Sequence, residues 1–249
     1  MPPARRAAQG LIDAVPGTAK RTFGSGVHYV FHFNVVWDHW RDLAGGAWLT
    51  IRLSSLALVI GMALATVCAY AKAAGPGALR LIVAAYVEVI RNTPFLVQIF
   101  IIYFSLPALG IAVGANEAAL AAMVVNFGAY GTEILRAGIE SVPHGQIDAA
   151  RALGLTRLQT FRHVVLFPAL KTVFPALASQ FILLMLASSV VSAISAVELT
   201  AVTNSLQSTT FRPFEFYFVA TALYLAMALG FRAVLGGIYW RVFVRGRRS

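Results

Sequence analysis

The chain has 249 residues, of which 59% are hydrophobic and only 12% are charged. A typical soluble domain carries about 25% charged residues, so this composition excludes an ordinary soluble fold and indicates a polytopic membrane protein. The formal net charge is +10, but many basic residues lie near the ends of apolar segments, as is typical of cytoplasmic loops, and they form no continuous face for nucleic acid. The single cysteine, Cys68, excludes a disulfide framework and a thiolate metal site.

Two segments precede the main membrane region. Residues 1–26 are rich in Arg, Ala, Gly and Pro, and we expect them to form a disordered tail. Residues 27–46 mix aromatic side chains with histidines and charged residues, which is typical of an amphipathic segment at the membrane interface. We assign residues 47–243 to one transmembrane domain and residues 244–249, which include three arginines, to a basic cytoplasmic tail.

Intervals without charge locate the membrane spans, because a spanning helix needs about 20 mostly apolar residues. The sequence predicts an all-α protein with five transmembrane helices. Their expected ranges are 53–71, 79–106, 115–139, 171–197 and 214–240. We expect tight turns at residues 75–77 and 107–110, and a polar loop over residues 200–212.

The second span crosses a polar cluster at residues 88–94. Asn92, Thr93 and Pro94 should break or kink the helix there, because proline removes a backbone donor and restricts the residue before it. Freed backbone groups tolerate lipid depth only where they line a cavity or contact protein. The break is therefore expected to line a cavity or to contact protein.

The basic residues of the short loops predict the orientation in the membrane. Lys72 and Arg80 flank the first connection, and several more surround residues 143–171, whereas the opposite side has only Arg212 in its two short loops. Short loops rich in Lys and Arg face the cytoplasm, so we expect the N-terminus outside and the C-terminus in the cytoplasm. Five basic residues before the first span oppose this assignment, but charges near span ends carry more weight.

A polar and basic stretch, residues 145–168, separates the third and fourth spans. Between Pro143 and Gly154, about ten residues could form a helix ~15 Å long, and its alanines would present little bulk to a partner. Asp148 and Arg151 could fix the register of that contact by charge, and Gly154 would allow a sharp exit. We interpret the stretch as a docking helix, with a plain connecting loop as the alternative.

Three sequence blocks, in order, resemble a known family. Residues 148–150 are Asp-Ala-Ala, Gly154 follows, and residues 166–168 are Leu-Phe-Pro. They are similar to the coupling motif of the permease subunits of bacterial ABC importers, which runs Glu-Ala-Ala, three residues, Gly, and about ten residues to Leu-Pro. Residues 88–98 and 130–139 resemble the polar amino-acid branch of the same binding-protein-dependent transport family.

The resemblance covers roughly residues 30–243 and departs from the family pattern in three places. Asp148 replaces the usual Glu, which keeps the charge but shortens its reach. Pro168 stands one position later than in a Leu-Pro junction, and the tail before residue 27 has no recognised counterpart.

This resemblance implies a type I ABC importer permease fold, with a short cytoplasmic coupling helix at about residues 145–155 between the third and fourth spans. It implies a subunit that moves a polar or charged amino acid inward across the bacterial inner membrane. The implied partners are a cytoplasmic ABC ATPase dimer, a second permease subunit, a periplasmic amino-acid-binding protein and membrane lipid. The implied ATPase-coupling residues are Gly145, Asp148, Ala149, Ala150, Arg151 and Gly154.

The chemistry of ATP is expected on another chain. The sequence has no Gly-x-x-x-x-Gly-Lys-Ser/Thr phosphate loop, so ATP and Mg²⁺ are expected to bind to the ATPase partner. We expect no cofactor, no metal site and no enzymatic activity on this chain itself.

Ionisable and polar groups within spans are the candidates for the substrate pathway, because they are costly in lipid and usually face a pathway or a partner. Glu88 and Arg91 could contact a zwitterion or pair with each other one helical turn apart. Three groups spaced to share one face of the third span could line the pathway or bond between helices, and serines of the fourth span could line it or allow close packing. The full set is Glu88, Arg91, Asn92, Thr93, Asn126, Tyr130, Glu133, Ser188, Ser192 (with Ser195 on the same expected face) and Glu198.

Two other functions remain open at this point. A secondary transporter would normally show inverted repeats and paired broken helices, and the sequence indicates only one break. A membrane scaffold or sensor could use the short cytoplasmic helix to recruit a partner, without coupling to ATP.

Overall fold

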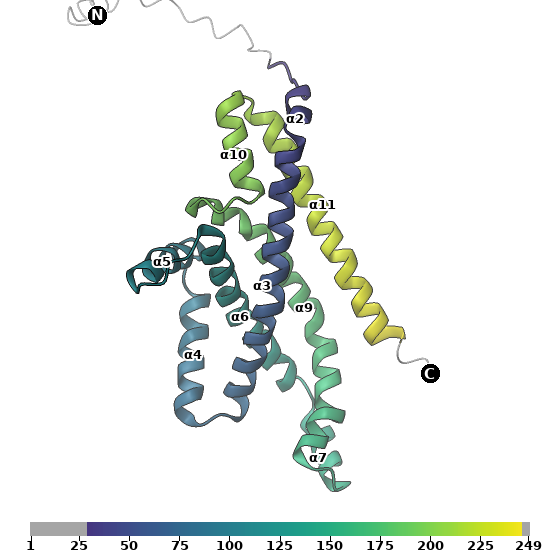
Figure 1. Cartoon of the computed structure of the whole chain (residues 1–249). Helices are drawn as coiled ribbons and strands as arrows, with labels where there is room; N and C mark the ends of the chain where they lie inside the picture. Colours follow the sequence, from purple (N-terminus) through teal and green to yellow (C-terminus); the bar gives the residue numbers. More distant parts are fainter. Residues whose placement is uncertain (1–28, 246–249) are drawn as a thin grey trace, which may run out of the picture. The chain divides into compact units, whose positions relative to one another are not determined.

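The computed structural model describes residues 29–245, so the tail predicted for residues 1–26 and most of the basic tail at residues 244–249 lie outside the described residues. Residues from Phe33 onward form one unit, whose helices are labelled in Figure 1. In chain order the α-helices are α2 (Asn34–Asp38), α3 (Trp40–Ala74), α4 (Gly77–Arg91), α5 (Phe95–Ala108), α6 (Ala115–Glu140), α7 (His144–Ala152), α8 (Arg157–Thr160), α9 (Leu166–Ala187), α10 (Leu199–Thr210) and α11 (Pro213–Tyr239). Two π-helical turns, Phe161–Val165 and Trp240–Val244, and a 3₁₀ segment, Ser188–Ile194, continue α8, α11 and α9.

Four helical stretches are long and apolar enough to cross a membrane. They are Trp40–Ala73, Ala115–Glu140, Arg157–Ile194 and Pro213–Val244. A fifth apolar region consists of α4 and α5, which meet at a bend of 114°. The all-α class and the five apolar regions are confirmed. The second region is two helices joined at the expected break, and not one straight span.

Two spanning helices are longer than the charge-free intervals that predicted them. α3 begins at Trp40, so residues 40–46 continue the first span instead of belonging to a separate interfacial segment. The fourth helical stretch begins at Arg157 and not near residue 171. A charged side chain such as that of Arg52 is exposed on its helix and need not end it, which a rule based on charge-free intervals misses.

Most of the residues predicted to form a polar loop, 200–212, belong instead to helix α10, which ends at Thr210. Glu198 caps this helix, because its carboxylate accepts a hydrogen bond of 2.9 Å from the Ala201 N–H. One face of α10 is buried at helical spacing, and it consists of Leu199, Thr203 and Leu206. The loop prediction was wrong because the polar composition of the segment concealed an amphipathic helix.

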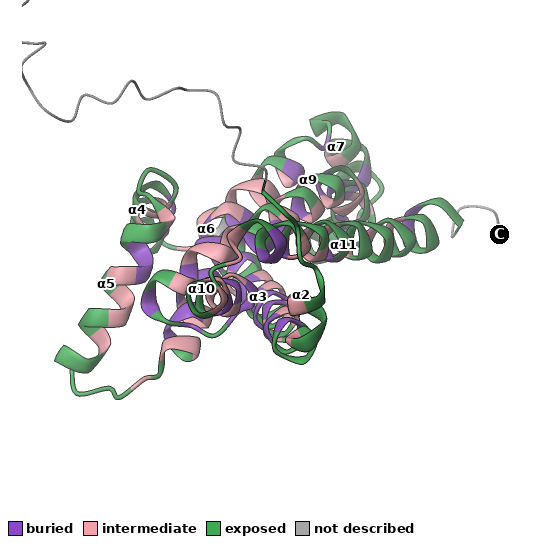
Figure 2. Cartoon of the chain, turned by 90° about the horizontal axis from the view of Figure 1, so that it is seen from above, coloured by how far each residue is buried: buried purple, intermediate pink, exposed green. Residues whose placement is uncertain are grey.

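Helix α6 is the centre of the unit, since it packs against α3, α4, α5 and α9. Figure 2 shows the buried residues concentrated along α3 and α6, whereas α4 and α11 are largely exposed. The segments α4, α5 and α9 are therefore positioned by their contacts with α6, whereas α11 packs mainly on α9 and α10.

Glycines allow α3 and α6 to approach closely. A Cβ atom on Gly131 would lie 2.8 Å from the Cβ atom of Ala65, and one on Gly128 would lie 2.6 Å from Cδ2 of Leu64. Small residues are the usual basis of helix packing in membranes, where lipid supplies no hydrophobic drive for association. The short separation of the two helices therefore depends on these glycines.

We expect Gly131→Ala to lower the melting temperature of the solubilised protein, because the added methyl meets a methyl that is fixed to the α3 backbone. Overpacking of this kind costs about 1–3 kcal/mol. Combining it with Ala65→Gly should restore part of the loss. The matched control is Gly230→Ala on α11, where an added Cβ meets no atom within 4 Å. Equal melting temperatures for Gly131→Ala and Gly230→Ala would contradict the tight packing.

Candidate functional site

The short helix predicted between the third and fourth spans is α7, which lies at the end of the unit opposite α10 (Figure 1). It ends in a Schellman motif: the Leu155 N–H donates to the Ala150 carbonyl at 3.2 Å, and the Gly154 N–H donates to the Arg151 carbonyl at 2.9 Å. Gly154 has a φ of +79°, a conformation that glycine adopts without strain. The sharp exit expected at Gly154 is confirmed.

One face of α7 is open to a partner. Gly145, Asp148, Ala149 and Ala152 are exposed, and their spacing of three and four residues places them on a single face. Ala150 is only 5% exposed, so within the implied coupling set its side chain faces the rest of the chain. Arg151 is exposed and lies 3.7 Å from Asp148, which leaves both charges accessible from solution.

The junction between α7 and the fourth span accommodates the late proline. A capping box formed by Thr156 and Gln159 begins α8. The π-helical turn Phe161–Val165 then leads into α9, and Pro168 follows in its first turn. A π turn holds one more residue than an α turn, which matches the single-position shift of Pro168 from the family pattern.

At the break between α4 and α5, nearby side chains donate hydrogen bonds to groups at the end of α4. The Asn92 amide donates to the Glu88 carboxylate at 2.8 Å and to the Glu88 carbonyl at 2.9 Å. The Thr93 hydroxyl donates to the Val89 carbonyl at 2.8 Å. These bonds satisfy carbonyls that a helix end leaves without an intrahelical donor.

The expected pairing of Glu88 with Arg91 does not occur. Glu88 accepts from Asn92, while the guanidinium of Arg91 lies 5.5 Å from the centre of the Tyr130 ring on α6. The Tyr130 hydroxyl also lies 3.5 Å from the Arg91 carbonyl. The spacing along α4 would allow Glu88 and Arg91 to form an ion pair, but the guanidinium of Arg91 lies instead over the aromatic ring of Tyr130 on α6.

A buried amide pair joins the break to α6. Gln98 on α5 and Asn126 on α6 are 5% and 7% exposed, and the Asn126 amide donates to the Gln98 side-chain oxygen at 2.9 Å. The Gln98 amide nitrogen lies 2.7 Å from the Ile90 carbonyl and 3.0 Å from the Thr93 carbonyl. Gln98 was not among the predicted site residues, although an isolated amide in the charge-free run after Pro94 was a usable signal.

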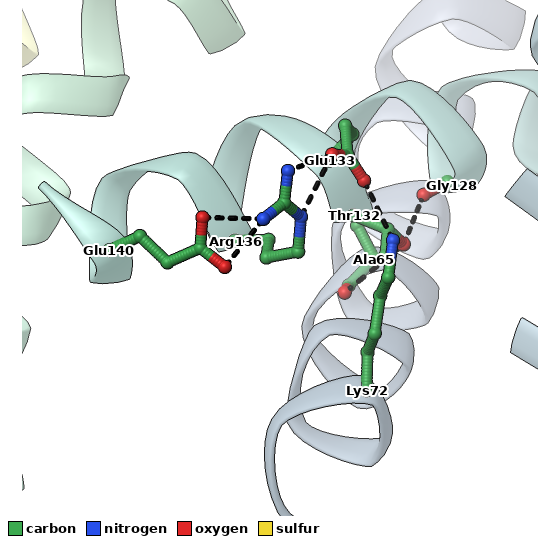
Figure 3. Close-up of polar contacts among 7 residues, drawn as sticks. All are labelled: Ala65, Lys72, Gly128, Thr132, Glu133, Arg136 and Glu140. Atoms are coloured by element: carbon green, nitrogen blue, oxygen red, sulfur yellow. Dashed lines mark hydrogen bonds and ion pairs between the residues drawn. The ribbon is translucent and has the colours of Figure 1, made fainter. Parts of the chain in front are cut away.

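Glu133 points away from Asn126 and Tyr130, toward α3. Figure 3 shows Lys72 reaching it from α3, with Arg136 between Glu133 and Glu140. Lys72 Nζ lies 3.0 Å from Glu133, and Arg136 contacts Glu133 and lies 2.5 Å from Glu140. The structure therefore brings Asn126 and Tyr130 together at the break and gives Glu133 a different role, in an ion-pair network that sequence reasoning missed.

The three serines of the fourth span do not all share a face, because Ser188 is separate from Ser192 and Ser195. Residues 188–194 form a 3₁₀ helix with three residues per turn, so Ser188 is buried with Val191 and Ile194. Ser192 points elsewhere, into a hollow of about 530 Å³ that Ser195, Asp42 and Asn204 also line. The expected common face was wrong because it assumed an α-helical period.

Glu198 is fully buried beside α11 and not open at the outer surface. Besides capping α10, its carboxylate accepts a hydrogen bond of 2.5 Å from the Tyr224 hydroxyl. Burial raises the pKa of the Glu198 carboxyl, and its hydrogen bonds to Thr200, Tyr224 and Ala201 oppose that shift. Its position favours a structural polar cluster over direct contact with a substrate.

Residues 46–242 match the family of binding-protein-dependent transport system inner membrane components, and the chain belongs to this family. It is therefore a multi-pass permease subunit of an ABC importer in the inner membrane. The resemblance inferred from the three sequence blocks is confirmed.

Individual relatives and a solved structure agree with this assignment. The chain is 32% identical to the octopine transport system permease protein OccM of Rhizobium meliloti over 223 residues, which cover 86% of this chain and 91% of that protein. It is 31% identical to the glutamine transport system permease protein GlnP of Escherichia coli K12 over 201 residues, or 80% and 92% of the two chains. It is also similar to a crystal structure of an amino acid ABC transporter with histidines, with a TM-score of 0.80 and 35% identity over 86% of this chain and 100% of that chain. The type I ABC importer permease fold is confirmed.

The ion-pair network should stabilise the contact of α3 with α6. Glu133→Gln removes the carboxylate that Lys72 and Arg136 share, and its side chain is only 21% exposed. We expect a loss of about 1–3 kcal/mol, measured as a lower melting temperature. Glu140→Gln is the matched control, because this partner of Arg136 is 61% exposed and should contribute at most about 1 kcal/mol. Equal losses for the two variants would contradict the structural role of Glu133.

Proposed function

We propose that this chain moves a polar or charged amino acid inward, together with a second permease subunit, a periplasmic binding protein and a cytoplasmic ATPase dimer that binds ATP and Mg²⁺. The amino-acid class is supported by the substrates named for its relatives, which include octopine, L-cystine and glutamine. The observation that carries the proposal is the open face of α7 formed by Gly145, Asp148, Ala149 and Ala152.

The proposed orientation places α7 in the cytoplasm, with the N-terminus outside and the C-terminus inside. Basic residues support it, because Lys72, Arg151, Arg157 and Arg162 belong to the helix ends and connections that surround α7. An ATPase that approaches from this side meets a short helix with small side chains and one exposed pair of opposite charges. Closure of the ATPase dimer would then act on α6 and α9, which α7 connects.

We expect Ala149→Trp to reduce substrate uptake and ATP hydrolysis stimulated by the binding protein at least 10-fold, because the indole would prevent close approach to the open face of α7. Both activities are measured in liposomes that contain the permease and its ATPase subunit, and binding of the ATPase is measured by co-purification.

The matched control is Ser208→Trp, which adds the same ring to an exposed position of α10. It should leave co-purification of the ATPase unchanged. If Ala149→Trp folds, binds the ATPase and supports normal uptake, α7 is only a connecting loop. If ATP hydrolysis never responds to a polar or charged amino acid in the unmodified complex, the proposed substrate class is wrong.

We propose further that the break between α4 and α5 borders the substrate pathway, with Arg91 facing a substrate carboxylate. Arg91 is exposed at the break with its guanidinium over the Tyr130 ring, and the irregular backbone there needs a cavity or a protein neighbour.

Arg91→Met should therefore lower uptake at least 10-fold, while leaving membrane insertion and co-purification of the ATPase intact. Arg80→Met, at an exposed position near the start of the same helix, is the control and should retain uptake near the unmodified rate. Normal uptake by Arg91→Met would remove the break from the pathway.

A further inference from the structure

The bend between α4 and α5 is supported on one side by α6. Both helices pack on α6, and they diverge from each other in the view of Figure 2. Within the described residues, the side chain of Gln98 bonds to the end of α4 while its backbone belongs to α5. The same side chain accepts a bond from α6 through Asn126, so one buried amide contacts all three helices.

The surroundings determine which way the Gln98 amide points. Its nitrogen faces the carbonyls of Ile90 and Thr93 and the Thr93 hydroxyl oxygen at 2.9 Å. Carbonyl oxygens only accept, so the NH₂ group must point toward α4. The Gln98 oxygen is thereby turned to α6, where it needs a donor, and the Asn126 NH₂ group supplies one.

Neither glutamate nor leucine at position 98 could make the same set of hydrogen bonds. Ionised glutamate could accept from Asn126 but could not donate to the carbonyls of Ile90 and Thr93, protonated glutamate could donate only one bond, and leucine could do neither. In a low-dielectric interior an unpaired amide or carbonyl is costly, so loss of the pair should favour a rearranged bend in which these groups find other partners.

We propose that the Gln98–Asn126 amide pair is the positioning element that sets the angle between α4 and α5 and thereby places Arg91 beside Tyr130 for selection of the substrate. The second half of this statement rests on the proposed function, because it assumes that the break borders the pathway. The first half concerns geometry alone and is tested separately.

Loss of the amide pair should affect the bend without releasing α4 from α6. The Tyr86 hydroxyl donates to the Val125 carbonyl at 2.6 Å, and Val83 and Val87 are buried on the same face of α4. These contacts do not involve Gln98. A change at the amide pair is therefore expected to move α5 and the residues of the break, while α4 stays in place.

The angle can be measured with two spin labels. Cys68→Ser removes the single cysteine of the chain, and Leu81→Cys on α4 and Phe104→Cys on α5 provide labelling sites that are 72% and 65% exposed. Pulsed electron double resonance is recorded on the assembled transporter in lipid nanodiscs, with labelled chain diluted by unlabelled chain. We expect one narrow distance distribution in this background, and a shift of several ångströms or a clear broadening in Gln98→Leu and Gln98→Glu.

Two further variants serve as a second test of the amide pair and as a control. Asn126→Ala removes only the donor from α6, and it should broaden the same distribution if Gln98→Leu fails to fold. Gln207→Leu is the matched control, because this amide bonds only to the adjacent Ser208 hydroxyl among the contacts of its side chain in the described region, and it should leave the distribution unchanged. An unchanged distribution in both Gln98→Leu and Asn126→Ala would overturn the proposal.

Uptake measurements distinguish the positioning role of the amide pair from selection of the substrate at the break. We expect the relative uptake of lysine, glutamine and glutamate to change at least 5-fold in Gln98→Glu and Asn126→Ala, with a larger effect on the half-saturating concentration than on the maximal rate. A changed distance with unchanged uptake of all three would overturn selection at the break while leaving the importer assignment intact. An unchanged distance with loss of uptake would overturn the positioning role.

Discussion

The close packing of α3 against α6 is the contact on which the rest of the structure depends. Because lipid supplies no hydrophobic drive between helices, the association rests on complementary surfaces, and Gly128 and Gly131 remove the Cβ atoms that would hold the two backbones apart. Helix α6 then presents different side chains to its neighbours along its length. Asn126 and Tyr130 face the break between α4 and α5, and Glu133 faces α3 through Lys72.

Helix α6 also joins the two regions assigned to function. Fourteen residues separate Asn126 from Glu140 at its end, a rise of ~21 Å in an α-helix, and α7 follows after a short connection. The Lys72–Glu133 ion pair lies between Asn126 and Glu140 along the helix and connects the C-terminal half of α6 to α3. A displacement of α7 would therefore reach the break through a helix that is already braced against α3, so that α3 and α6 move together.

The sequence could predict the features whose causes are local. Charge-free runs located the apolar regions, Pro94 located the break, and Gly154 located the exit from α7, because each depends on the residues themselves. Features set by distant partners could not be predicted in this way. Gln98 has partners on α4 and α6, Arg91 lies over the ring of Tyr130 instead of pairing with Glu88 three residues before it, and the 3₁₀ segment changes the period on which the serine face was based.

Small residues serve two different purposes in this chain, and only their surroundings distinguish them. On α6, Gly128 and Gly131 are buried where the helix meets α3 of the same chain. On α7, Gly145 and Ala149 have the same lack of bulk but remain exposed, and an added Cβ at Gly145 meets no atom within 4 Å. The helix that bears them is short, polar and closed by its own Schellman motif, so it keeps its shape without a neighbour on that side. A face that is ordered and yet unfilled is what the proposed docking of a separate ATPase on α7 requires.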